Sequence, residues 1–123
     1  MRKVVIALAI ATFACSSVSY AEGQKMSLED VCAMMANSAK NSASLFRDSG
    51  KRNREQEYGW WQERIVEDET STYQKMESSL ASAKIYVDAI YIRYADLIPA
   101  MVEIKFKHDC IEEGWDFSPL MGD

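Results

Sequence analysis

The decisive stretch of this sequence is residues 73–94, YQKMESSLASAKIYVDAIYIRY. Apolar side chains recur in it at alternating steps of three and four residues, which is the spacing of one face of an α-helix. Ser71 and Gln74 match the capping box that begins many helices, so we predict a helix over about residues 72–96. A second apolar set widens the buried face, which favours a central position in a helical bundle. The first set is Tyr73, Met76, Leu80, Ala83, Val87, Ile90 and Tyr94, and the second is Ile85, Ala89 and Ile92.

The segment from Ser27 to Gly50 predicts another amphipathic helix. Ser27 suits the N-cap position, and two acidic residues follow it in the first turn. Gly50 suits a C-terminal stop, so we predict a helix over about residues 28–48 with Cys32 on its buried face. Its apolar stripe consists of Leu28, Val31, Cys32, Met35, Ala39, Ala43 and Phe46.

Residues 54–68 predict a shorter helix between these two. Gly59 weakens the prediction, because glycine costs about 1 kcal/mol relative to alanine inside a helix. The acidic run 67–69 is unfavourable at a helix C-terminus, so we expect the helix to end there. The shared apolar face carries Tyr58, Trp61 and Ile65.

Pro99 predicts the first turn of a final helix, where proline is well tolerated. Asp96 is the candidate N-cap, and Gly114 is the expected end. Residues 102–107 also alternate between apolar and polar side chains, so a strand is the alternative there. No other segment alternates convincingly, which would leave such a strand without a partner and favours the helix. The apolar face of the helix carries Val102, Phe106 and Cys110.

Residues 1–21 have the pattern of a secretory signal peptide: two basic residues, an apolar run over residues 4–14, and small residues leading to Ala21. The run is about half of the ~20 residues that a membrane-spanning helix needs. We therefore expect cleavage after Ala21, export to the periplasm and no membrane anchor. A lipoprotein carrying its lipid on Cys15 is the alternative, although Thr12 stands where such signals carry an aliphatic residue.

Cys32 and Cys110 are the two cysteines that remain after the signal peptide is removed. In an oxidising compartment they should form a disulfide. Closing a loop of about 80 residues contributes about 4–5 kcal/mol in the chain-entropy treatment. Redox-active thiols usually lie close together in sequence, so a structural role is favoured. We predict an all-α fold, a single domain over residues 22–123 with an aromatic tail: a small bundle of about four helices closed by Cys32–Cys110.

The charge balance excludes some partners. Removal of the signal leaves 12 of the 14 basic residues against 19 acidic residues, a net charge near −7. This disfavours binding to nucleic acid, whose phosphates require a basic surface, and to anionic lipid. One basic cluster stands out in this acidic sequence, and we interpret it as a solvated helix end and loop rather than a phosphate site. It consists of Arg47, Lys51, Arg52 and Arg54.

Few residues offer catalytic chemistry. His108 is the only histidine, whereas a zinc site needs about three or four protein ligands. A Cys–His nucleophile needs a free thiolate, which the predicted disulfide removes. We therefore predict no metal, no cofactor and no catalytic residue. The remaining catalytic alternative is hydrolysis of envelope glycans by carboxylates of the second helix, such as Glu63 and Glu67.

Aromatic residues are the most distinctive candidates for binding. Trp60 and Trp61 are consecutive, so they diverge by about 100° around a helix and at least one should be partly exposed. Tryptophan and arginine dominate binding hot spots, and Arg64 lies one turn away. We predict a contact surface of Trp60, Trp61 and Arg64, followed by Trp115 and Phe117 of the tail. The structural alternative is a tryptophan at the rim of the bundle, stacked on Arg64.

Three segments of the chain resemble small exported proteins, many of them phage-encoded, whose function is not known. They are the signal peptide, the block from Cys32-Ala-Met-Met to Phe46-Arg-Asp-Ser-Gly50, and the block Phe106-Lys-His-Asp-Cys110. The helix containing Asp88-Ala-Ile-Tyr91 is similar to a helix of those proteins. The resemblance implies export and a helical fold, and it supplies no catalytic residues.

These observations favour a non-enzymatic periplasmic protein that binds another envelope protein, such as a phage-type effector or inhibitor. A carrier of small apolar ligands is the alternative. It would need a pocket of at least ~300 Å³ between the third and fourth helices, lined by residues such as Tyr86, Ile90 and Phe106. The oligomeric state remains open.

Overall fold

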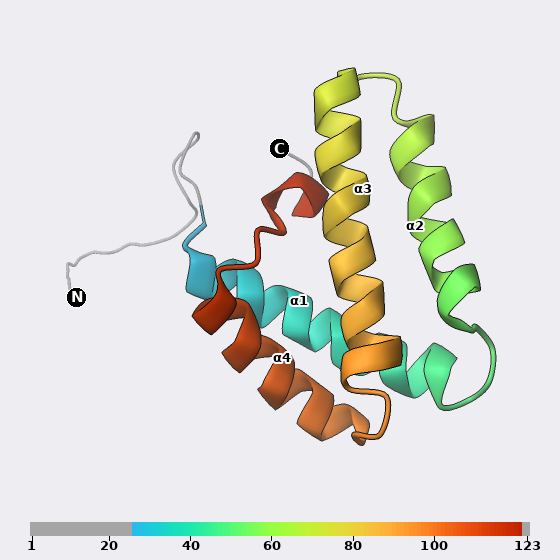
Figure 1. The fold of residues 1–123 in the computed structure, drawn as a ribbon, viewed down its shortest axis with the longest axis vertical. Helices are drawn as coiled ribbons and strands as arrows, with labels where there is room; N and C mark the ends of the chain where they lie inside the picture. Colours follow the sequence, from blue (N-terminus) through green and yellow to red (C-terminus); the bar gives the residue numbers. More distant parts are fainter. Residues whose placement is uncertain (1–25, 122–123) are drawn as a thin grey trace, which may run out of the picture.

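The computed structural model describes residues 26–121, which form an all-α bundle without strands in that range (Figure 1). The predicted fold class is therefore confirmed. The predictions about residues 1–21, including the signal peptide and Cys15, lie outside the described residues. The α-helices are α1 (Leu28–Ser42), α2 (Arg54–Glu67), α3 (Tyr73–Asp88) and α4 (Pro99–Glu113). Two π-helical turns, η1 (Ala43–Arg47) and η2 (Ala89–Arg93), extend α1 and α3 respectively. A 3₁₀ turn, η3 (Ser118–Met121), follows α4 in the tail.

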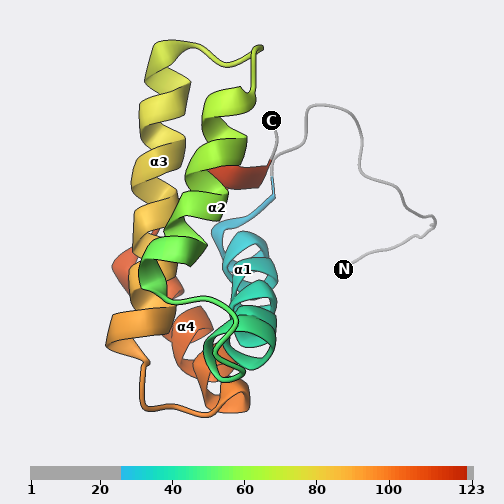
Figure 2. The ribbon, with the colours of Figure 1, turned by 90° about the vertical axis from the view of Figure 1, so that its right-hand side faces the viewer.

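The helices are arranged as two pairs. α2 and α3 run side by side as a hairpin, and α1 packs along α4 beneath them (Figures 1 and 2). After α4 the chain turns back, so that η3 lies against α3. The core forms where the second half of α3 meets α1, α4 and the returning tail.

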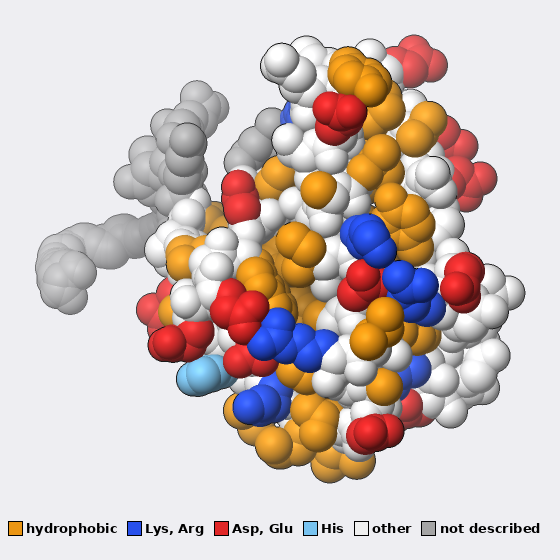
Figure 3. All heavy atoms as spheres, viewed as in Figure 1, with side chains coloured by type: hydrophobic (Ala, Val, Ile, Leu, Met, Phe, Trp, Pro, Cys, Tyr) orange, Lys and Arg blue, Asp and Glu red, His pale blue; other side chains and the backbone are white. Residues whose placement is uncertain are grey.

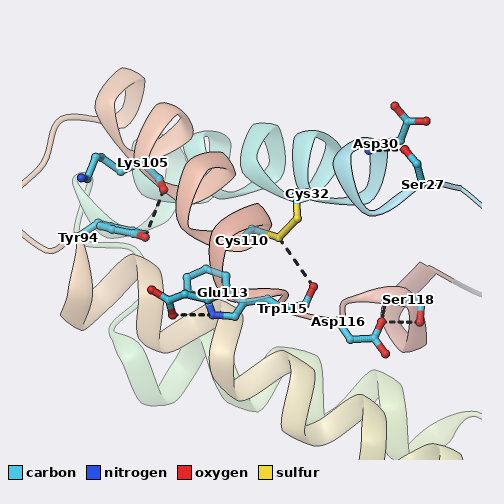
Figure 4. Close-up of a disulfide and its surroundings, with 10 residues drawn as sticks. All are labelled: Ser27, Asp30, Cys32, Tyr94, Lys105, Cys110, Glu113, Trp115, Asp116 and Ser118. Carbon is cyan, nitrogen blue, oxygen red and sulfur yellow. Dashed lines mark hydrogen bonds between the residues drawn. A yellow bond between two sulfur atoms is a disulfide. The ribbon is translucent and has the colours of Figure 1, made fainter.

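The disulfide predicted between Cys32 and Cys110 is present and joins α1 to α4 (Figure 4). The two Cα atoms are 5.7 Å apart, and both side chains are fully buried. The Cys110 Sγ lies 3.9 Å from the carbonyl oxygen of Trp115. This is a packing contact, because a disulfide sulfur carries no proton to donate. The bond therefore fixes the α1–α4 pair next to the point where the tail departs.

Two helix starts differ from the predicted ones. Thr72, not Ser71, caps α3, and its Oγ1 accepts a hydrogen bond from the backbone N–H of Lys75 at 3.0 Å. Ser71 instead donates its hydroxyl to Asp68. The predicted Asp96 cap of α4 is also wrong, because the N-cap is Ile98, which has no side-chain cap. Proline in the first turn lacks one of the N–H donors that a cap would satisfy.

The other helix boundaries agree with the predictions. Ser27 caps α1 by accepting a hydrogen bond from the N–H of Asp30 at 3.1 Å, and α2 ends within the acidic run. Gly114 ends α4 in the left-handed conformation at φ +68°, which glycine adopts at little cost. The strand alternative for residues 102–107 is excluded, since α4 is continuous there. Its predicted face is fully buried: Val102, Phe106 and Cys110.

The core differs from the predicted stripe at one central residue. Tyr86 belongs to neither predicted apolar set of α3, yet its ring is fully buried and packs edge-to-face on Phe106 and Phe117. Its hydroxyl shares hydrogen bonds with Ser38 and Ser42 of α1 at 2.8 and 3.1 Å. Burial raises the pKa of Tyr86 to about 12, so the hydroxyl stays protonated. A polar atom that is satisfied in this way can occupy the core.

Residues at the ends of the predicted stripes are exposed instead of buried. Tyr73 is 70% exposed and Leu28 is 44% exposed, because they lie in the first turns of α3 and α1. Ile85 and Ile92 of the second set are also exposed. Periodicity identifies a face, but the buried length depends on how far the neighbouring helices extend.

The basic cluster does not form a solvated helix end. The Arg47 side chain is 11% exposed, and its guanidinium donates to the carbonyl oxygens of Ile90, Tyr94 and Leu97. It therefore caps the end of η2, where backbone carbonyls lack helical partners. Arg54 pairs with Asp88 of α3 at 2.7 Å. The interpretation of this cluster as a solvated helix end is therefore wrong for Arg47 and Arg54.

Candidate functional site

The second half of α2 presents the predicted aromatic residues. The guanidinium of Arg64 stacks over the Trp60 ring, 4.0 Å from its centroid, and donates to the Trp60 carbonyl oxygen at 3.2 Å. Arg52 approaches the same ring at 5.3 Å. The Arg64 side chain is 51% exposed, and Trp60 is half-buried. Both guanidinium groups are close enough to the half-buried indole for cation–π interactions, which favour one orientation of the ring.

Trp61 connects this surface to the core. Its ring packs edge-to-face on Trp60, with centroids 5.2 Å apart, and on Tyr86 at 5.4 Å. Its Nε1 is buried and donates no hydrogen bond within residues 26–121. An unmade hydrogen bond of this kind costs about 1–3 kcal/mol. Of the two consecutive tryptophans, Trp61 faces inward and Trp60 faces the rim, as consecutive residues of a helix require.

The tail reaches this surface and borders a groove beside it. The groove encloses about 330 Å³ and lies between α2, the start of α3 and η3. Two α3 hydroxyls hold the tail there: Ser82 donates to the carbonyl oxygen of Asp116 at 2.8 Å, and Ser79 to that of Pro119 at 3.4 Å. We call this the aromatic-rim surface; it comprises Trp60, Trp61, Arg64, Ile65, Pro119 and Leu120.

Phe117 is not a surface residue, which corrects its assignment to the contact surface. Its side chain is fully buried and stacks on Phe106, with centroids 5.6 Å apart and planes 22° from parallel. The reason is the return of the tail over the open end of the α1–α4 pair, where an apolar side chain completes the core. Sequence spacing alone did not show this, because the tail has no helical period.

Trp115 lies apart from the aromatic-rim surface and borders a different groove. Its half-buried ring packs edge-to-face on Phe106, and its Nε1 donates to Glu113 at 3.1 Å (Figure 4). The guanidinium of Arg93 lies 5.2 Å from the ring centroid. The predicted contact residues therefore divide between one surface on α2, a second at the end of α4, and the core.

Two polar networks surround the aromatic core. In the first, the buried carboxylate of Glu57 accepts hydrogen bonds from the Tyr91 hydroxyl at 3.2 Å and from Arg52 at 3.4 Å. Burial, reinforced by the charge of Glu57, raises the pKa of Tyr91. Glu57 is thus a structural residue inside the hairpin, whereas its acidic neighbours on α2 lie on the solvent-exposed face.

In the second network, Tyr94 donates its hydroxyl to Asp109, and Arg93 donates to Glu113. Burial of Asp109 opposes its ionisation, but hydrogen bonds from Tyr94 and His108 outweigh that effect and lower its pKa. The hydrogen bond from Arg93 lowers the pKa of Glu113. Both carboxylates are therefore held ionised as partners of neighbouring groups.

The residues that the sequence suggested as catalytic alternatives lie at the surface. Glu63 is 65% exposed and pairs with Arg64 at 3.6 Å, and Glu67 is also exposed. A carboxylate that acts as a general acid needs a buried setting, and neither of these two carboxylates is buried. The side chain of His108 is 65% exposed. Within residues 26–121, no cluster of three or more potential ligands is placed to hold a metal, and no helix has the length and apolar content to cross a membrane.

The carrier hypothesis placed a pocket in the core between the third and fourth helices. The side chains expected to line that pocket instead fill the space. Tyr86, Ile90 and Phe106 are fully buried, and the two aromatic rings pack on one another at 5.8 Å. A groove of about 870 Å³ lies elsewhere, between the start of α1, the start of α3 and the tail. Sequence reasoning missed it, because it is assembled from three segments that are distant in the chain.

Comparison with protein-family models, curated proteins and solved structures found no significant match to this chain. Function is therefore inferred from the side chains and their surroundings.

Proposed function

We propose that this protein is a non-enzymatic binding protein of the periplasm, and that it contacts another envelope protein through the aromatic-rim surface. The resemblance to phage-encoded exported proteins favours an effector or inhibitor of a host envelope protein. The buried disulfide suits an oxidising compartment.

The observation that carries the proposal is the stack of Arg64 on Trp60 beside a groove. Tryptophan and arginine side chains that are fixed before binding lose little conformational freedom on contact, which favours affinity. Trp61 anchors this pair to the core through Tyr86. The surface thus combines a rigid base with an accessible edge.

A purely structural role for the stack predicts a different outcome. If Trp60 and Arg64 only stabilise α2, their removal lowers the free energy of unfolding and leaves any interaction of the folded protein unchanged. If they form the contact surface, their removal abolishes the interaction while the fold persists. The two roles are therefore separable by measuring binding and stability on the same variants.

The test is capture of periplasmic proteins on the immobilised wild type, followed by Trp60→Ala and Arg64→Ala variants. A photo-crosslinking residue at position 60 identifies the protein in direct contact. Ile104→Ala is the matched control, because Ile104 is 59% exposed on α4 and outside the aromatic-rim surface. We expect one partner to be retained by the control and lost by both variants. Retention by all three proteins would show that the surface is wrong.

A further inference from the structure

A groove of about 440 Å³ lies along the α1–α4 pair, whose helices Figures 1 and 2 show side by side. From α1 it is lined by Ala33 and Ala36, whose small side chains let a neighbouring helix approach closely. The remaining lining comes from α4: Glu103, Ile104, Lys107, His108 and Ile111. We call this the α1–α4 groove. It shares no residue with the aromatic-rim surface.

α4 carries apolar side chains on two of its faces. One face is buried in the core and includes Val102 and Phe106. On the other, Ile104 is 59% exposed, and Ile111 follows it two turns later on the same side of the helix. Ile104 thus forms a ridge beside the groove that it lines. A face that offers both a ridge and a groove is able to pack against an identical face about a two-fold axis.

The charges at the edge of this groove are complementary to themselves. Glu103 and Lys107 are one turn apart on α4, so they are neighbours on its surface. If two copies of α4 pack antiparallel about a two-fold axis that passes between these residues, Glu103 of each copy lies opposite Lys107 of the other. The ridge residue Ile104 then lies close to the axis and meets Ile104 of the other copy.

Both charged groups can make this contact. Within residues 26–121, Lys107 belongs to no ion pair. Glu103 pairs with Lys40 of α1 at 3.4 Å through its Oε1 atom, and its side chain is 36% exposed. Since a carboxylate has two oxygens that accept several hydrogen bonds, Oε2 can pair with a second cation.

The charge balance favours a second copy as the occupant. After removal of the predicted signal peptide the net charge is near −7, so the acidic surfaces of two copies repel one another. The α1–α4 groove is an exception, because its lining holds one acidic, one basic and one histidine side chain. Figure 3 shows positive, negative and apolar side chains interspersed over the part of the surface that α4 occupies. A balanced groove offers no net attraction to a strongly basic or acidic partner, whereas a second copy supplies matching charges at the required positions.

We propose that the α1–α4 groove binds a second copy of this chain, giving a two-fold symmetric dimer with the two α4 helices antiparallel. Ile104 of the two copies packs at the centre, and the pairs Glu103–Lys107 close the interface on both sides of the axis. The aromatic-rim surface lies outside this interface. The dimer therefore displays that surface twice, which raises the avidity for a partner with more than one binding site.

The test is sedimentation equilibrium of the protein from residue 22 onward, with its disulfide formed. We expect a monomer–dimer equilibrium in the wild type. Glu103→Lys and Lys107→Glu each place like charges opposite one another, so each should weaken dimerisation by about tenfold or more. Thermal unfolding followed by circular dichroism identifies any variant that fails to fold, and Ile104→Ala then tests the same face.

Mixing the two variants tests the antiparallel arrangement directly. Glu103→Lys presents lysine at both positions and Lys107→Glu presents glutamate at both, so every crossed pair in a mixed dimer is attractive. We expect an equal mixture to associate more tightly than either variant alone. Glu77→Lys and Lys51→Glu are the matched controls, because they make the same charge changes at exposed positions outside the groove. Both should dimerise as the wild type does.

Three results would overturn the proposal. They are a wild type that stays monomeric at every concentration, single variants that dimerise as the wild type does, and a mixture that associates no better than its components. Trp60→Ala should leave the dimer intact, and its loss there would place the interface on the aromatic rim instead. These measurements involve no partner protein, so they decide the dimer independently of the proposed function.

Discussion

The α1–α4 pair and the α2–α3 hairpin are stabilised in different ways. A buried disulfide holds α1 to α4, and both helices contribute fully buried apolar side chains to the core. In α2, by contrast, the one buried residue is Glu57, and the hairpin is joined by polar contacts and by the edge of Trp61. The covalently closed pair therefore supplies a stable base, and the hairpin carries the side chains that we propose for binding.

Loss of the disulfide should have the largest effect on this contrast. We expect the double variant Cys32→Ser/Cys110→Ser to lose about 4–5 kcal/mol of unfolding free energy, since its unfolded chain is no longer constrained. Urea denaturation of both proteins measures the difference. Alkylation of the protein from residue 22 onward should label two thiols only after reduction. Two reactive thiols in the unreduced protein would show that the bond does not form there.

Truncation of Phe117 should cause the second-largest loss of unfolding free energy. Phe117→Ala removes a fully buried ring from the junction of the tail with the core, and comparable substitutions cost about 3–5 kcal/mol. Phe117→Leu is the matched control and should cost clearly less. Chemical denaturation measures both. A small loss in Phe117→Ala would mean that the tail does not close the core in solution.

Loss of the buried carboxylate should destabilise the hairpin moderately. Glu57→Leu leaves the Tyr91 hydroxyl and the Arg52 guanidinium without their acceptor, at about 1–3 kcal/mol. Glu55→Leu is the control, because Glu55 is exposed on the same helix. Equal stability of the two variants would contradict a structural role for Glu57.

Removal of the rim cation should have a small effect on stability. Arg64→Ala breaks the stack on Trp60 at an exposed position, and such contacts contribute about 0.5–1 kcal/mol. Thermal unfolding measures this, and Arg64→Lys retains the charge without the planar stack. A loss as large as that of Phe117→Ala would favour the structural role over the proposed binding role.

Acid titration should reveal the smallest effect, because the contribution of a single ionised carboxylate is present at neutral pH and is lost only in acid. The lowered pKa of Asp109 means that its contribution is present above the ordinary Asp pKa of about 3.9 and is lost as the pH falls through the lower folded-state pKa. Tyr94→Phe removes a hydrogen bond to Asp109 and should move acid unfolding to higher pH. Circular dichroism during acid titration measures the shift. Tyr73→Phe, at a ring 70% exposed, should not move it.

Much of the candidate site was visible in the sequence. The pair Trp60–Arg64 follows from helical spacing, and the structure places the two side chains in contact. The groove at the start of α1 was not visible, since Met34 and Met121 are far apart in the chain and line one groove only in the folded protein. The burial of Phe117 was not visible either, because the tail lacks a repeating period.

The sequence by itself determined the four helices, most of their ends and the cysteine pair that joins the first to the last. These features depend on short-range spacing and capping, or on the two cysteines that follow the predicted signal peptide. Tertiary structure decided which polar residues are internal. The side chains of Tyr86 and Glu57 are buried and that of Arg47 is largely buried. Each has a hydrogen-bond partner from another part of the chain. A buried polar group needs such a partner, and only the fold brings it within hydrogen-bonding distance.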